Sequence, residues 1–255
     1  MYDVTAVRYG TVETTKAEVY FRHHAYGEPD EAVRMDYYFW VLRVASDVTL
    51  VDTGFDPAVG ARRGRTTLCP VPEALGRLGL TPADVSRVIV THFHYDHIGN
   101  LRLFPRARLL FSGREYDFWT GPWARRFQFA LSAEEPEIAY VEAAYRDGRA
   151  TRLGDEEEIA PGLRTRWVGG HTPGELIVTV DGLVLASDAV HFYEEVELDR
   201  PFAIVADLAG MYAAYETLRD LTASPDRVLI AGHDPRVMRE FPAVPGLDGL
   251  AVRLG

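Results

Sequence analysis

Five apolar segments of this chain each end at a histidine or an aspartate. Each is rich in leucine or β-branched residues and closes with small or polar residues, the pattern of a short buried strand followed by a turn. The five are DVTLVD at 47–52, SRVIVTH at 86–92, LRTRWVGGH at 163–171, GLVLASD at 182–188 and RVLIAGH at 227–233. Strand ends that deliver polar side chains to one edge of a sheet are typical of a functional site on a rigid scaffold.

The segments between these strands predict an α/β (α+β) architecture. FWVLRV at 39–44 is a further strand, with a turn around Ala45–Asp47. Apolar spacing predicts helices over 70–79 and 205–222, and further helices within 113–145, broken around 120–122. Strands come first and then alternate with helices, which favours packed sheets with helices outside. No linker or internal repeat divides the 255 residues, so we expect a single domain over 1–255.

The stretch THFHYDHIGN at 91–100 crowds His92, His94, Asp96 and His97 into six positions. Imidazole and carboxylate together suit zinc and similar divalent ions. His92 and His94 are two apart, so both point to the same side of an extended stretch. Asp96 and His97 follow in a bend and can reach a second ion nearby. The predicted ligands are His92, His94 and His171 for one ion, Asp96, His97 and His233 for the other, and Asp188 between the two.

A plainer interpretation exists for each of these residues alone. An isolated histidine or aspartate after a strand is more often a turn or capping residue than a ligand. The coincidence of several such residues at successive strand ends favours the metal site. Asp52 is expected just behind the ligands, accepting an imidazole N–H, with a simple turn at DTG as the alternative.

Net charge, cysteine content and the N-terminal stretch limit the partners and the cellular location that can be expected. The formal net charge of −11 disfavours a nucleic acid or an anionic membrane as the main partner. Cys69 is the only cysteine, which excludes a disulfide or a cysteine-based zinc site within one chain. The stretch MYDVTAVRYGTVET lacks the pattern of an export signal, and no apolar run reaches membrane-spanning length. We therefore expect a cytoplasmic protein.

The motifs resemble those of the metallo-β-lactamase superfamily. The matching pieces, in the superfamily's order, are LVDTG at 50–54, THFHYDHIGN at 91–100, GGHTPGE at 169–175, ASDA at 186–189 and AGHDP at 231–235. The resemblance implies a four-layer αββα sandwich, the metallo-β-lactamase fold, with the metals at one edge between the sheets. It also implies two divalent ions per chain, zinc first, with iron, manganese and cobalt as alternatives.

Within the superfamily the chain resembles the N-acyl homoserine lactonase-like group, which includes 4-pyridoxolactonase-type enzymes. The similar stretches are YGEPDEAVRMDYYFWVLR at 26–43 and SDAVHFYEEVELDRPF at 187–202. The resemblance implies a hydrolase that opens a small-molecule lactone, foremost an N-acyl homoserine lactone (quorum quenching), through a metal-bridging hydroxide. The alternative is another lactone, ester or thioester, such as an aromatic lactone or a glyoxalase II-type substrate. Members of the group are often dimers, so a homodimer is expected.

The resemblance also assigns roles near the metals. Asp96 is the expected general acid for the leaving alkoxide. His191 stands where well-known members carry a tyrosine that touches the substrate carbonyl, so we expect His191 to make that contact, with Phe192 and Tyr193 bordering the substrate.

Other polar and aromatic stretches have simpler readings. The run EEVE at 194–197 is expected to be exposed charge, with a place at the mouth of the site as the alternative because it lies close to Asp188. His23 and His24 are expected to lie on the surface or at a pocket rim. The aromatic stretch EYDFWTGPWARRFQF at 115–129 suits either a pocket lining or plain core.

Overall fold

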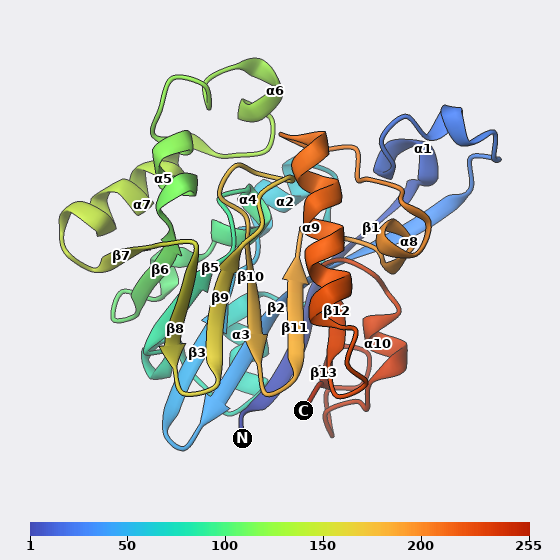
Figure 1. Ribbon diagram of the computed structural model, residues 1–255. Coiled ribbons are helices and arrows are strands. Elements are labelled where there is room, and N and C mark those ends of the chain that lie inside the picture. Colours follow the sequence, from blue (N-terminus) through green and yellow to red (C-terminus); the bar gives the residue numbers. More distant parts are fainter.

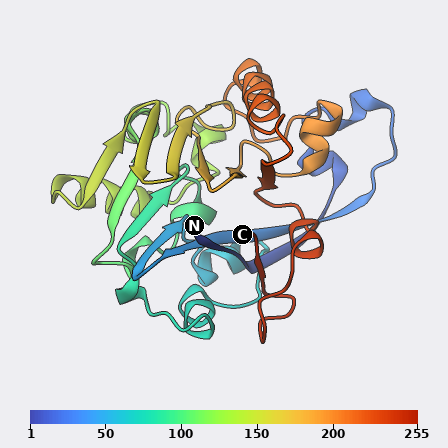
Figure 2. The ribbon, with the colours of Figure 1, turned by 60° about the horizontal axis from the view of Figure 1, so that its bottom comes forward.

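Two β-sheets lie face to face in the computed structural model, which describes residues 1–255, and helices cover the outer side of each sheet (Figures 1 and 2). This arrangement confirms the predicted αββα sandwich. One connected hydrophobic core includes buried side chains from both sheets, among them Trp40 of the first and Leu185 of the second. No helix combines the length and apolar character needed to cross a bilayer.

The first sheet has an antiparallel half and a parallel half. Its strands, in spatial order, are β13 (Ala251–Arg253), β1 (Asp3–Thr15), β2 (Ala32–Val44), β3 (Asp47–Val51), β5 (Arg87–Val90), β6 (Arg108–Ser112) and β7 (Ala150–Leu153), with β4 (Thr66–Thr67) paired to β1. The parallel half begins at β3 and β5. Since parallel strands end at the same edge, the residues that follow β3 and β5 come together there.

The second sheet places three more strand ends at one edge. Its strands, in spatial order, are β12 (Val228–Ala231), β11 (Leu183–Ser187), β10 (Leu176–Val180), β9 (Leu163–Trp167) and β8 (Glu156–Ala160). Strand β12 is parallel to β11, while β10 is antiparallel to both β11 and β9. Strands β9, β11 and β12 therefore run in the same direction, and the loops that follow them carry His171, Asp188 and His233.

The predicted helices are present. Helix α3 (Val71–Arg77) lies within 70–79, and α9 (Leu208–Leu221) within 205–222. Asp207 caps α9 by accepting the Ala209 N–H, and the helix buries a stripe at helical spacing, namely Met211, Ala214, Tyr215 and Leu218. The region 113–145 contains α5 (Gly113–Trp119), α6 (Phe127–Ala130) and the start of α7 (Glu135–Arg146), with the expected break after Thr120.

Short helices fill the connections. These are α1 (Lys16–Val19), α2 (Pro57–Arg62), α4 (Tyr95–Ile98), α8 (Tyr193–Leu198) and α10 (Val237–Glu240), with 3₁₀ turns η1 (His23–Tyr26), η2 (Pro82–Asp84) and η3 (Leu101–Leu103).

The connection between β1 and β2 forms an arm that projects from the body and carries α1 and η1 (Figure 1). His24 is exposed on this arm, as predicted, but the surface prediction for His23 is wrong, because that side chain is only 4% exposed. Arg22 takes a left-handed conformation and the 3₁₀ turn follows directly, which turns the His23 ring inward, edge-on to Tyr26.

Candidate metal centre

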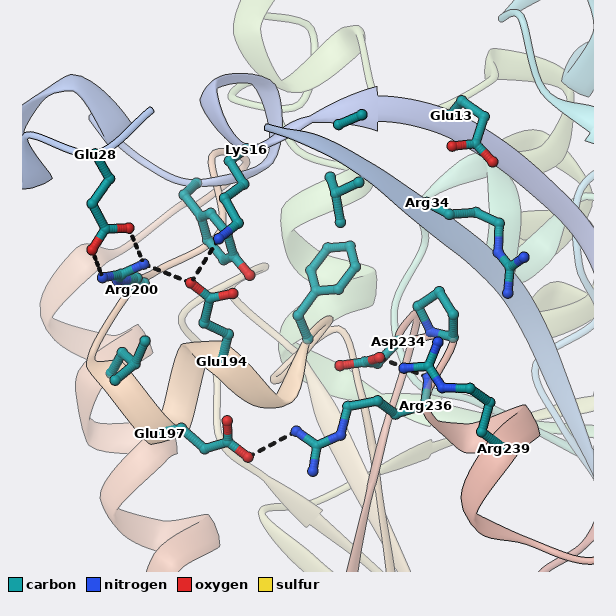
Figure 3. A pocket seen from close by; sticks show the side chains of 16 residues that line it. Glu13, Lys16, Glu28, Arg34, Glu194, Glu197, Arg200, Asp234, Arg236 and Arg239 are labelled. Atoms are coloured by element: carbon teal, nitrogen blue, oxygen red, sulfur yellow. Dashed lines mark hydrogen bonds and ion pairs between the residues drawn. The ribbon is translucent and has the colours of Figure 1, made fainter. Parts of the chain in front are cut away.

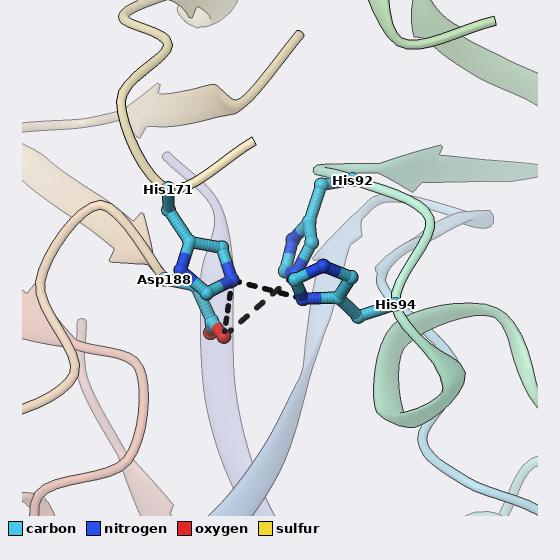
Figure 4. Close-up of side chains that lie close together, drawn as sticks. All are labelled: His92, His94, His171 and Asp188. Carbon is cyan, nitrogen blue, oxygen red and sulfur yellow. Dashed lines mark hydrogen bonds and ion pairs between the residues drawn. The ribbon is translucent and has the colours of Figure 1, made fainter. Parts of the chain in front are cut away.

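The ends of β3, β5, β9, β11 and β12 meet at one edge of the sandwich, and all seven predicted ligands lie there. Their ligand atoms form two buried groups, each with all atoms within 4.8 Å of one another. One group is His92, His94, His171 and Asp188, and the other is Asp96, His97 and His233. Figure 4 shows the first group with its side chains pointing toward one another, His92 and His94 from the loop after β5 and His171 and Asp188 from two other loops.

Asp188 lies between the two groups. Its Oδ1 is 3.0 Å from His233 Nε2 and 3.3 Å from His97 Nε2. Its Oδ2 is 3.4 Å from His171 Nε2 and 3.7 Å from His92 Nε2. Each carboxylate oxygen thus faces a different group, which is the arrangement that a bridging ligand needs.

Four of the clustered histidines use Nδ1 to contact an oxygen outside the cluster. The partners are Asp52 Oδ2 for His97 at 2.8 Å, the Ile204 carbonyl for His171 at 2.8 Å, the Asp36 carbonyl for His233 at 2.8 Å, and Glu175 Oε2 for His92 at 3.1 Å. An N–H at Nδ1 leaves the lone pair on Nε2, and these contacts fix the orientation of each ring.

Several nitrogens at the centre lack a hydrogen-bonding partner. Nε2 of His92 and Nε2 of His97 are buried and make no hydrogen bond. His94 instead presents Nδ1, which lies 2.9 Å from the Nε2 of His171. Buried polar atoms almost always have a partner, and a divalent cation would satisfy these nitrogens. The donor set therefore fits the two ions that the sequence predicts.

The electrostatics of the two groups differ. Burial lowers the pKa values of His92 and His171 well below the usual range and that of His94 to about 3, which keeps these rings neutral and able to bind a cation. Burial acts in the same direction on His97, but Asp188, Asp52 and Asp96 raise its pKa well above the usual range. The surroundings of His97 thus favour a positive charge.

Asp52 lies where the sequence predicts, directly behind the cluster. Besides the His97 ring, its carboxylate accepts the backbone N–H and the hydroxyl of Thr91, both at 2.8 Å. Asp52 has a φ of 62° and Ser187 a φ of 47°, so the chain adopts a left-handed conformation at the ends of both β3 and β11. Such conformations are uncommon for non-glycine residues and often occur at functional sites.

Two supporting glutamates were missed in the sequence. Glu115 of α5 is fully buried and accepts N–H groups from Phe93 at 2.9 Å, Gly174 at 2.8 Å and Trp119 Nε1 at 2.6 Å, so it ties the loop of His92 to the loop of His171. Glu175 lies beside His92 and closes the quoted motif GGHTPGE, which was the available signal. Glu115 has no such signal, because its partners are mainly backbone groups far away in sequence.

His191 does not face open space. Its side chain is fully buried, with Nε2 3.0 Å from Asp188 Oδ2 and Nδ1 3.3 Å from Glu195 Oε1. Burial alone would lower the pKa of His191, but Asp188 and Glu195 raise it to about 9. The structure therefore places His191 between two carboxylates, and its predicted contact with a substrate carbonyl stays a prediction.

Neither Phe192 nor Tyr193 lines the apolar cavity beside the metal ligands, although Phe192 lines the larger charged cavity, so their predicted contact with substrate stays a prediction. Phe192 is extended, so its ring points away from His191 toward Tyr20, and Tyr193 is buried with its hydroxyl donating to the Leu229 carbonyl. The exposed-charge prediction for 194–197 fails at Glu195, which is fully buried. That carboxylate accepts the N–H groups of His191 and Phe192, both at 2.9 Å.

A cavity of about 350 Å³ opens beside His94 and His171. No lysine, arginine, aspartate or glutamate lines it. Its apolar wall consists mainly of Phe21, Phe118, Trp119, Phe129, Leu131, Ile204 and Val205. The aromatic stretch at 115–129 therefore contributes a pocket lining.

A larger cavity of about 840 Å³ lies between the arm and α8 (Figure 3). It is lined by charged side chains that pair with one another. Arg200 contacts Glu28 and Glu194, and Arg236 contacts Glu197 at 2.9 Å. None of the seven clustered residues lines it, so the smaller apolar cavity is the candidate substrate site.

Comparisons with known proteins agree with this geometry. The family model described as the metallo-beta-lactamase superfamily matches residues 35–233. The N-acyl homoserine lactonase AiiB of Agrobacterium fabrum is 27% identical over 221 residues, which cover 76% of this chain and 78% of the relative. The human metallo-beta-lactamase domain-containing protein 1 is 33% identical over 197 residues, which cover 75% of this chain and 60% of that protein.

A solved structure shows the same fold. It is an N-acyl homoserine lactone hydrolase with the product N-hexanoyl-L-homoserine bound at its catalytic metal centre. It superposes with a TM-score of 0.78 at 18% identity, over 95% of this chain and 97% of that one. Because the family model covers most of the chain, including every clustered histidine and aspartate, this protein belongs to the metallo-beta-lactamase superfamily.

Proposed function

We propose that this protein is a dinuclear-metal hydrolase that opens the ring of an uncharged lactone, foremost an N-acyl homoserine lactone. One observation carries the proposal: Asp188 joins two buried ligand groups directly beside an apolar cavity. The names of the relatives support the lactone assignment, since AiiB and the superposed hydrolase both act on N-acyl homoserine lactones.

The lining of the cavity favours a neutral substrate with an apolar tail. A volume of about 350 Å³ lies at the lower end of the range for small-molecule sites. Phe118, Phe129 and Ile204 offer contacts to an acyl chain. An anionic thioester such as a glutathione conjugate would find no lysine or arginine among the lining residues, which disfavours the glyoxalase II-type alternative.

The chain's own residues have distinct roles in this proposal. The two groups would hold the ions, which when bound polarise a carbonyl and lower the pKa of water. Asp96, whose Oδ2 is 3.8 Å from His97 Nε2 and 3.9 Å from His233 Nε2, would hold a proton at its carboxylate and deliver it to the ring oxygen that leaves. Zinc is the first candidate, because three neutral imidazoles and a carboxylate suit it.

An aromatic lactone is the second candidate. The rings of Phe21, Phe118, Trp119 and Phe129 surround the cavity, and such a lining also suits a flat aromatic substrate.

The test is lactone opening by metal-reconstituted protein, followed as acid release. The substrates are homoserine lactones of increasing acyl length, an aromatic lactone and a glutathione thioester, with a chelated sample as blank. We expect metal-dependent kcat/KM of about 10⁴ M⁻¹s⁻¹ or more on a homoserine lactone. Fast turnover of the thioester with no lactone opening would refute the proposed substrate class, and equal rates with chelator would refute the metal centre.

A further inference from the structure

We infer that Glu195 and His191 form a positioning pair that holds the carboxylate of Asp188 in its bridging orientation. The inference rests on the proposed metal centre and not on the proposed substrate. It assigns His191 a different role from that of the tyrosine that the resembling lactonases carry at this position.

The first step is the geometry at Asp188. Its Oδ1 faces only ligands of the second group, but its Oδ2 has a further neighbour in His191 Nε2, at 3.0 Å. That distance is shorter than those from Oδ2 to His171 and His92. His191 belongs to neither ligand group, so its contact restrains Asp188 from outside the metal positions.

The second step is the anchoring of His191 itself. Its other nitrogen faces Glu195 Oε1, and its ring stacks on Phe202 with 3.5 Å between centroids and 10° between planes. Each ring nitrogen of His191 therefore faces a carboxylate, and Phe202 covers one face of the ring. The ring is fully buried, and its nitrogens approach the two carboxylates as ion-pair contacts without hydrogen-bond geometry.

The third step is the anchoring of Glu195. Its Oε1 accepts two backbone N–H groups at the start of α8, and its Oε2 accepts the hydroxyl of Tyr215 at 2.8 Å. Tyr215 lies on α9, which packs on the second sheet. The orientation of Asp188 is thus set by a continuous chain of contacts from α9 through Glu195 and His191. Outer contacts of this kind typically change metal affinity or activity by about 10–100-fold when they are removed.

Two substitutions separate this role from a contact with substrate. His191→Phe keeps the stacking on Phe202 and removes both nitrogens, and Glu195→Gln keeps the size and an acceptor oxygen but removes the charge. Zinc affinity is measured by competition with a chromophoric chelator, and the Co(II)-substituted forms are compared by their absorption spectra. We expect His191→Phe to weaken zinc binding about 10–100-fold, and Glu195→Gln to weaken it less in the same direction.

Kinetics at saturating metal provide a second readout. We expect kcat to fall in His191→Phe, while KM stays within about threefold, because the residue does not touch the substrate. The altered cobalt spectrum should appear without any substrate present. His191→Tyr installs the residue of the resembling lactonases, whose single hydroxyl cannot contact both carboxylates, so it should also weaken zinc binding.

The matched control is His23→Phe, which removes another buried imidazole, on the arm. Its zinc affinity should equal that of the wild type, and thermal unfolding of every variant in chelator checks the metal-free fold.

Unchanged zinc affinity in both His191→Phe and Glu195→Gln would overturn the inference, as would a His191→Tyr variant with full affinity and turnover. If His191→Phe bound only one zinc ion at saturating zinc, His191 would be a metal ligand and the inference would be wrong. Absence of zinc binding by the wild type would refute the metal centre itself.

Discussion

At the scale of single residues, the proposed reaction makes its strongest demand on Asp96. In the proposed reaction its carboxylate both binds a metal and protonates the leaving oxygen. A substitution can affect these two roles to different extents. We expect Asp96→Asn to lower kcat by about 10²-fold or more, because the amide cannot donate the proton as an acid does. Metal content should fall much less, since the amide oxygen remains a weak ligand.

The measurement pairs kcat with metal analysis of the same sample. Asp220→Asn is the control, because it makes the same change on the exposed face of α9. A fully metallated Asp96→Asn variant with near-normal turnover would remove Asp96 from the proton-transfer step.

At the scale of elements, α7 contains a buried carboxyl group that makes stability depend on pH. Burial, and then Glu134, raises the pKa of Glu137 to about 8, and its Oε2 has no hydrogen-bonding partner. A carboxyl whose pKa is raised in the folded state binds its proton more tightly there than in the unfolded chain. Its contribution to stability is therefore present at low pH and is lost as pH rises from about 4.5 to 8.

Glu137→Gln should remove this dependence, because the amide stays neutral. We expect the variant to be more stable than the wild type by roughly 4–5 kcal/mol near pH 8.5, a Tm increase of roughly 10 °C or more, and to match it near pH 5. Thermal unfolding across this range provides the measurement.

The control is Glu135→Gln, which changes an exposed glutamate on the same helix and should leave the pH dependence of Tm unchanged. A constant difference between Glu137→Gln and the wild type at all pH values would contradict the linkage.

Elements also show what the sequence can predict. The strand ends at Asp52, His92 and Asp188 were predictable, because an apolar run followed by a polar residue is a local pattern. The positions of Glu115 and Glu195 were not, since most of their partners are backbone N–H groups, which any residue type can supply, and the others, Trp119 and Tyr215, form no recognisable motif with them. Phe192 lines the charged cavity instead of the apolar one for a local reason, because an extended residue points its side chain opposite to that of its neighbour.

At the scale of the whole molecule, the proposed metal positions connect the two sheets. Ligands follow β5 in the first sheet and β9, β11 and β12 in the second, so bound metal would link both halves of the sandwich. Ligands that bind only the folded state stabilise it by mass action, by about 4 kcal/mol per site at a thousandfold excess over Kd. We expect a chelator to lower Tm by roughly 10 °C or more while leaving far-UV circular dichroism at room temperature unchanged.

Scanning calorimetry with and without chelator tests this expectation, and added zinc should restore the original Tm. The Asp220→Asn variant should respond as the wild type does. A Tm that changes neither with chelator nor with added zinc would contradict the expectation that bound metal links the two sheets.

Both ends of the described chain lie at the edge of the sandwich that is remote from the clustered histidines (Figure 1). Tyr2 contacts Asp181 in the turn before β11, whereas Asp188 follows the other end of that strand. The carbonyl of Gly255 accepts the N–H of Val4, near the start of β1, at 3.2 Å. Five residues of strand separate the two edges by roughly 17 Å. A tether attached at either end would therefore hold the protein to a bead or an electrode with the cavity facing the solution, so an immobilised form should keep its entrance open to small molecules.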